Sequence, residues 1–162
     1  MRLLGGSATP MGFGEVYTSL QSKIIDGAEN NEMALTSNGH GDVCKYYSYD
    51  MHQMIPDILI GNSAFLDGLP KEERQVFDEG FALINEVERR EWENAVAAAK
   101  EKAQTEQGVE FLYPDTAPFQ EICLPMHEAI LEQYPDLRPF YDAILEYNQM
   151  YADGRPEGGS DS

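Results

Sequence analysis

The sequence is poor in cysteine and in basic residues, and it has no long apolar run. Lysine and arginine together number 11 against 29 aspartates and glutamates, so the formal net charge is −18. A charge of this sign argues against nucleic acids and anionic membranes as partners. No stretch of the sequence is long and apolar enough to span a bilayer, and no internal repeat is present.

The motifs of common enzymes and metal sites are also missing. The sequence has no GxSxG, no HExxH and no group of clustered histidine and cysteine ligands. We therefore expect neither catalysis nor a bound metal or cofactor. The two cysteines, Cys44 and Cys123, lack CxxC spacing. They either pair in an oxidising compartment or remain two buried free thiols, and the small number favours free thiols.

One stretch, residues 10–31, carries the most informative pattern. Glycines flank an aromatic residue at Gly12-Phe13-Gly14, and a short helical segment follows in which Val16 and Leu20 share a face. Two β-branched residues then enter a turn, after which Glu29, Asn30 and Asn31 follow. This order predicts a helix that leads into a short buried strand with polar side chains at its exit. In α/β folds, ligands tend to bind where such strands end.

The same residues resemble the signature of the TRAP-transporter solute-binding proteins, extracytoplasmic receptors for carboxylate-bearing solutes. The match is F-x-E-x-Y, a glutamine, and then D-G-x-E-N, at Phe13, Glu15, Tyr17, Gln21, Asp26, Gly27, Glu29 and Asn30. The resemblance continues through the motifs Lys45-Tyr46-Tyr47-Ser48-Tyr49, His52, Pro56-Asp57 and Leu69-Pro70 to about Asn148. It implies an α/β fold like that of the periplasmic binding proteins.

Members of this family have two lobes that close on the ligand, and they are roughly twice as long as this chain. The resemblance implies that residues 1–150 form the C-terminal half, which is the second lobe with a long helix spanning both lobes, and that the N-terminal lobe is missing. The arginine that pairs with the ligand carboxylate would then lie upstream of Met1. The resemblance implies that the full-length protein works in the periplasm or outside the cell. No charged and apolar signal segment precedes the fold in this sequence, and its absence says nothing about the compartment.

The remaining elements follow from local patterns. Apolar residues at helical spacing predict one helix over Leu69–Gln104, stopped by Gly108. Extended segments are predicted near Ile24–Asp26 and His52–Ile60, in one shared sheet, and at Val109–Tyr113. Two helices are expected after residue 116, the first kinked or broken by Pro125. Residues 151–162 are small and polar, and we expect a disordered tail.

The resemblance implies four ligand-binding residues. Phe13 would pack on the apolar side of the solute, and a buried Asn30 would bond its carboxylate or a hydroxyl. Glu29 would hold water or orient His52. A histidine bonded to a backbone carbonyl is the alternative for His52. Three other residues of the motif have structural roles, Glu15 at the helix start and Asp26 and Gly27 in the turn, and His40 is expected to be a solvated loop residue.

Two functions remain open at this point. The first is the solute-binding subunit of a TRAP-type transporter, which delivers an organic acid to the membrane permease. The solute could be a dicarboxylate, a sugar acid, a sialic acid or a keto acid. The second is an acidic helical interaction module with no small ligand. In either case, the surface facing the missing lobe would be apolar and would promote self-association.

Overall fold

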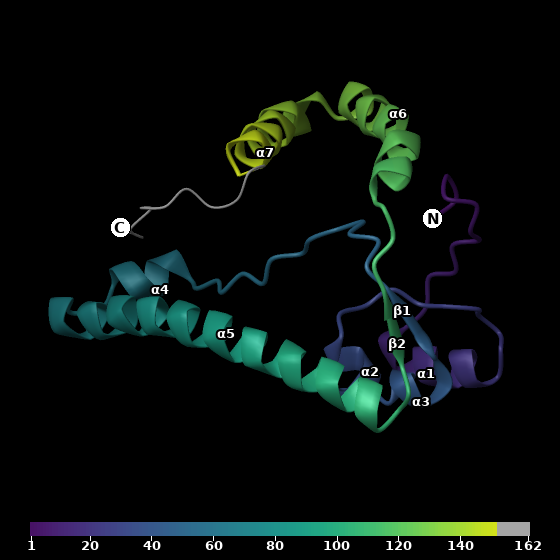
Figure 1. The fold of residues 1–162 in the computed structure, drawn as a ribbon. Helices are drawn as coiled ribbons and strands as arrows, with labels where there is room; N and C mark the ends of the chain where they lie inside the picture. Colours follow the sequence, from purple (N-terminus) through teal and green to yellow (C-terminus); the bar gives the residue numbers. More distant parts are fainter. Residues whose placement is uncertain (152–162) are drawn as a thin grey trace. The chain divides into compact units, whose positions relative to one another are not determined.

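The computed structural model describes residues 1–151, which are mostly helical with one two-stranded parallel sheet (Figure 1). In chain order the elements are α1 (Phe13–Gln21), α2 (Met33–Ser37), α3 (His40–Val43), β1 (Tyr46–Ser48), α4 (Ser63–Asp67), α5 (Lys71–Thr105), β2 (Glu110–Leu112), α6 (Ala117–Gln133), the 3-10 turn η1 (Pro135–Leu137) and α7 (Arg138–Met150). The chain divides into two compact units. Residues 8–115 form the larger unit, and among the described residues 1–7 group with 116–151.

The sheet of the larger unit joins residues that are more than 60 positions apart. Tyr47 lies opposite Phe111 in the parallel register, and both side chains are half-buried. The core beside them consists of Leu35, Ala103 and Val109, against which Tyr47 and Phe111 pack. Parallel strands require a long crossover, and here the connection contains α4 and α5. The predicted strand at Val109–Tyr113 is thus confirmed.

Helix α5 confirms the prediction of one long helix over Leu69–Gln104. Its 35 residues extend about 50 Å at 1.5 Å per residue. Glu72 and Glu73 lie in its first turn, where carboxylates stabilise the helix dipole. Only its last turns are buried, at Ala99 and Ala103. Gly108, with φ +68°, follows the end of the helix in the left-handed region that glycine tolerates.

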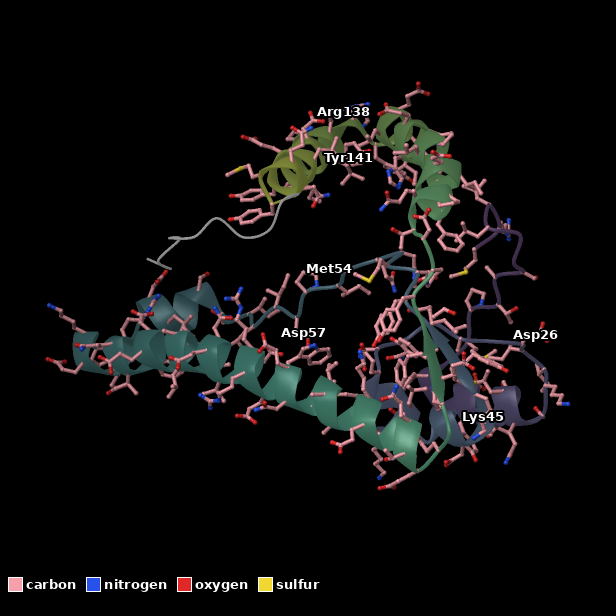
Figure 2. All side chains as sticks on the ribbon, viewed as in Figure 1. Asp26, Lys45, Met54, Asp57, Arg138 and Tyr141 are labelled. Carbon is pink, nitrogen blue, oxygen red and sulfur yellow. The ribbon has the colours of Figure 1, made fainter. Side chains whose placement is uncertain are left out.

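The two other predicted strands are wrong. Residues 24–26 form bends, and residues 52–60 run without regular structure from β1 towards α4 (Figure 1). A strand is defined by its hydrogen-bonded neighbour, and among residues 1–151 the sheet contains only β1 and β2. Ile24 and Ile60 are accordingly 73% and 85% exposed. In Figure 2, Met54 and Asp57 mark this unpaired segment and Asp26 marks the earlier loop.

The smaller unit is helical. A kink or a break was predicted at Pro125; helix α6 continues through this residue, so the break does not occur. Two side-chain pairs join α6 to α7: Arg138 bonds Glu128 at 3.0 Å, and His127 Nδ1 lies 3.3 Å from the Tyr141 hydroxyl. Both cysteines are free and half-buried. The predicted tail, apart from Tyr151, lies outside the described residues. None of the helices described here combines the length and hydrophobicity of a membrane span.

Candidate functional site

Phe13 is the first residue of α1, and the local contact between Gly12 and Glu15 fixes the start of this helix. The backbone N–H of Gly12 donates to Glu15 Oε2 at 3.1 Å, which satisfies one of the free donors at the helix start. The structural role predicted for Glu15 is therefore confirmed. The Phe13 side chain is 52% exposed, so its ring is available to a ligand.

His40 is not the solvated loop residue that the sequence predicted. It begins α3 and is only 6% exposed, and its ring centroid lies 5.8 Å from that of Phe13. Burial lowers the pKa of the imidazole, which favours the neutral ring. The prediction was wrong because burial depends on the packing of α3 against α1, which residues 37–41 do not reveal by themselves. The buried His40 ring thus contacts the ring of Phe13.

Three hydrogen bonds join the loop that carries Glu29 and Asn30 to β1 and the segment that follows it. The hydroxyl of Tyr47 donates to the backbone carbonyl of Asn30 at 2.8 Å, and that of Tyr49 donates to Glu32 at 2.7 Å. The amide of Gln53 donates to Glu29 at 2.9 Å. Residues 29–32 and 47–53 thereby form one polar junction at the exit of β1.

His52 lies in this junction between two carboxylates. Its Nδ1 is 2.7 Å from Asp50 Oδ1, and its Nε2 is 4.0 Å from Glu29 Oε2. The structure therefore brings Glu29 and His52 together, as expected, but Asp50 is the closer partner, and the partner is not a backbone carbonyl. Met51, with φ +52°, places an uncommon left-handed residue directly before His52.

Asn30 differs from the expectation of a buried residue, because it is exposed in this chain. Its Oδ1 accepts the backbone N–H of Asn31 at 2.8 Å. Within residues 1–151 its NH₂ group makes no hydrogen bond, so two donors remain for a ligand. Asn30 and Phe13 line one shallow hollow of about 490 Å³, together with Asn31, Met33, Ala34, Ser37 and Asn38.

An aromatic cluster packs beside the junction and stabilises it. This cluster was not predicted as part of the site. Tyr49 stacks on Tyr113 with ring centroids 4.9 Å apart, and Lys100 of α5 lies 5.0 Å from the Tyr49 ring. Burial raises the pKa of Tyr49 to about 12, and its bond to Glu32 acts in the same direction. The tyrosine-rich motif at 46–49 was visible in the sequence, but its partners lie far along the chain.

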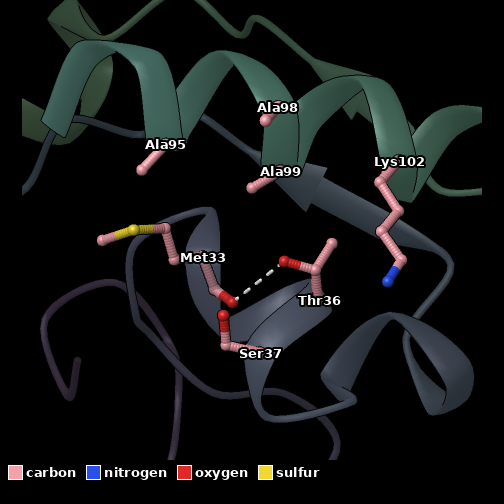
Figure 3. A pocket seen from close by; sticks show the side chains of 7 residues that line it. All are labelled: Met33, Thr36, Ser37, Ala95, Ala98, Ala99 and Lys102. Carbon is pink, nitrogen blue, oxygen red and sulfur yellow. Dashed lines mark hydrogen bonds between the residues drawn. The ribbon is translucent and has the colours of Figure 1, made fainter. Parts of the chain in front are cut away.

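A second hollow, of about 260 Å³, lies where α2 faces α5 (Figure 3). Alanines at 95, 98 and 99 form its α5 side, and Met33, Thr36 and Ser37 form the other, with Lys102 at one end. Thr36 bonds the carbonyl of its own helix at Met33. None of the four predicted ligand-binding residues lines this hollow. Among residues 1–151, no three histidine, cysteine, aspartate or glutamate side chains group together in a way that could hold a metal ion.

Comparison with known proteins agrees with the sequence resemblance. The profile of the family described as bacterial extracellular solute-binding protein, family 7, matches residues 1–134. A relative from Salmonella typhimurium, YiiZ, is 40% identical over 144 residues, which are 89% of this chain and 44% of that protein. The chain thus spans less than half the length of this relative.

Solved structures give the same result for the fold. A TRAP periplasmic solute-binding protein from Anaerococcus prevotii, with bound α/β-D-glucuronate, is 66% identical with a TM-score of 0.82, and the match covers 93% of this chain and 49% of that one. A second such protein, from Sulfitobacter sp. NAS-14.1 with bound β-D-galacturonate, is 34% identical with a TM-score of 0.77 over 85% and 46% of the two chains. These matches confirm the predicted fold class, a partial periplasmic-binding-protein-like α/β fold.

Proposed function

Because this chain belongs to family 7 of the bacterial extracellular solute-binding proteins, we propose that it carries part of the binding site of a receptor for a sugar acid. The family is one of transport receptors and not of enzymes. The ligand that we propose is a hexuronate, D-glucuronate or D-galacturonate. The observation that carries this choice is the 66% identity, over 93% of the chain, to a protein solved with glucuronate.

The chemistry of the junction supports a sugar acid. A hexuronate combines a carboxylate, several hydroxyls and an apolar ring face. Phe13 offers an exposed ring for the apolar face, and the free NH₂ of Asn30 can donate to the carboxylate or to a ring oxygen. The carboxylates of Glu29 and Asp50 can accept from hydroxyls. A dicarboxylate without hydroxyls has no donors for these acceptors. Its second carboxylate would also add repulsion from the two negative charges.

We also propose how the rest of the receptor completes the site. In residues 1–151, no arginine side chain bonds to Glu29, Asn30 or His52. The partner for the ligand carboxylate would come from a first lobe, as the family resemblance implies. Residues 1–150 would act as the C-terminal half, and closure of the two lobes would remove water from each hydrogen bond. The receptor would work in the periplasm or outside the cell and hand its ligand to the permease.

A chimera tests this proposal. In this hybrid protein, called the chimera below, residues 1–162 would replace the matching half of the Anaerococcus prevotii protein. Calorimetric titration with D-glucuronate, D-galacturonate, succinate and sialic acid would rank the ligands. We expect saturable binding of at least one hexuronate, at least tenfold tighter than that of succinate, which corresponds to about 1.4 kcal/mol. A folded chimera that binds succinate more tightly, or binds no hexuronate, would refute the proposal.

A further inference from the structure

Gln53 was not among the residues expected to contact a ligand, yet the structure places it at the centre of the junction. Its side chain crosses from the segment after β1 to the loop of residues 29–32, and its Nε2 donates to Glu29 Oε2 at 2.9 Å. The neighbouring His52 has its Nε2 4.0 Å from the same carboxylate oxygen. Gln53 therefore lies beside two of the four predicted ligand-binding residues.

The bond to Glu29 determines how the Gln53 amide is oriented. An ionised carboxylate is only an acceptor, so the end of the amide that faces it must be the NH₂ group. The other end, Oε1, then points away from Glu29 and keeps two lone pairs. Within the described residues 1–151, Gln53 makes this one hydrogen bond and its Oε1 accepts none. The Oε1 atom of Gln53 is therefore a neutral acceptor whose direction is fixed by the bond to Glu29, and the residue is exposed.

On this basis we propose that Gln53 is a specificity-determining residue whose Oε1 accepts a hydrogen bond from a ring hydroxyl of the bound sugar acid. The inference depends on the proposed function, because it requires a hydroxyl-bearing ligand at this junction. It adds a residue that distinguishes sugar acids from organic acids without hydroxyls.

A neutral acceptor is suited to this task for an electrostatic reason. The ligand is an anion and already meets the carboxylates of Glu29 and Asp50. A third carboxylate would add repulsion, whereas an amide oxygen accepts a hydroxyl proton without adding charge. Asp50 Oδ1 is occupied by His52 and Glu29 Oε2 by Gln53 itself. The Gln53 oxygen therefore extends the set of acceptors at this junction.

The test is a cycle of one substitution and one ligand change, measured on the chimera by calorimetry. Gln53→Met keeps the length of the side chain and removes both polar atoms. We expect it to raise the Kd for D-glucuronate by about threefold to tenfold, the effect of one neutral hydrogen bond. For one monodeoxy-glucuronate, which lacks the hydroxyl that Gln53 contacts, the same substitution should leave the Kd unchanged.

A matched control is available in α5. Gln75 also donates its Nε2 to a glutamate, Glu79, at 2.7 Å on an exposed surface, so Gln75→Met should change neither Kd nor thermal stability. If unsubstituted chimera binds no hexuronate, the proposed function fails. If it binds D-glucuronate and Gln53→Met weakens all deoxy analogues equally, or has no effect, the role of Gln53 is refuted while the proposed function stands.

Discussion

Replacing Tyr47 with phenylalanine removes one oxygen atom and isolates the bond that fixes the Asn30 loop. The lost contact is the 2.8 Å hydrogen bond from the Tyr47 hydroxyl to the carbonyl of Asn30. The ring itself stays packed, with centroid distances of 5.0 Å to Tyr49 and 5.4 Å to Phe111, so no cavity forms. A neutral hydrogen bond contributes about 0.5–1.5 kcal/mol. Because this one is partly accessible to water, we expect the lower half of that range, about 0.5–1 kcal/mol.

Two measurements follow from this number. The midpoint of thermal unfolding, Tm, should fall by about 1–4 °C, because a protein of this size loses roughly 2–4 °C in Tm per kcal/mol of stability. In the chimera, the loop would have to be ordered by the ligand, so the Kd for D-glucuronate should rise about twofold to fivefold. Tyr46→Phe is the control, since Tyr46 is in the same strand, is 68% exposed, and makes no side-chain hydrogen bond within residues 1–151. Equal effects of the two substitutions would refute the reasoning.

Three further predictions concern stability, pH and the chain by itself. Gly41→Ala would place a methyl group against Gln107, whose Nε2 bonds the Leu35 carbonyl and Asp42. Chemical denaturation should show that this substitution lowers the free energy of unfolding by about 1–2 kcal/mol. Gly80→Ala in α5, with open space around it, should instead raise the free energy of unfolding by up to about 1 kcal/mol. Equal outcomes for the two alanines would contradict the packing. Burial lowers the pKa of His40 below 6.5, so the unfolded chain takes up the proton first and the free energy of unfolding should fall as the pH drops below about 6.5. His40→Phe should flatten this dependence, and an unchanged pH profile would remove His40 as its source. The isolated 162-residue chain should bind hexuronates no tighter than millimolar, roughly −4 kcal/mol, and should self-associate; micromolar binding by a monomer in calorimetry and size-exclusion chromatography would contradict this.

The parts of the structure that were predictable from the sequence are the ones fixed by neighbouring residues. Helix α5 follows from apolar spacing within one segment, and the Gly12–Glu15 bond follows from residues three apart. The predictions of strands near Ile24 and Ile60 were wrong because β-branched residues indicate an extended backbone but do not determine whether a neighbouring strand pairs with it.

The same distinction applies to the candidate site. Phe13, Glu29, Asn30 and His52 came from a sequence motif, and their roles stay predictions. The contacts around them link distant residues: Tyr47 to Asn30, Gln53 to Glu29 and Lys100 to Tyr49. No local pattern encodes these pairs. The burial of His40 against Phe13 depends in the same way on how two helices pack.

The central claim is that residues 13–53 hold a sugar acid through Asn30, and calorimetric titration of D-glucuronate into the chimera and its Asn30→Ala variant tests it most directly. Removing the free NH₂ of Asn30 should weaken binding by about 1–3 kcal/mol if closure buries the bond, which is about a 5- to 150-fold rise in Kd. Both proteins should unfold at similar temperatures, because Asn30 is exposed and, within residues 1–151, its side chain makes only the local bond to the Asn31 N–H. Equal affinity of the two folded proteins for D-glucuronate would contradict the account.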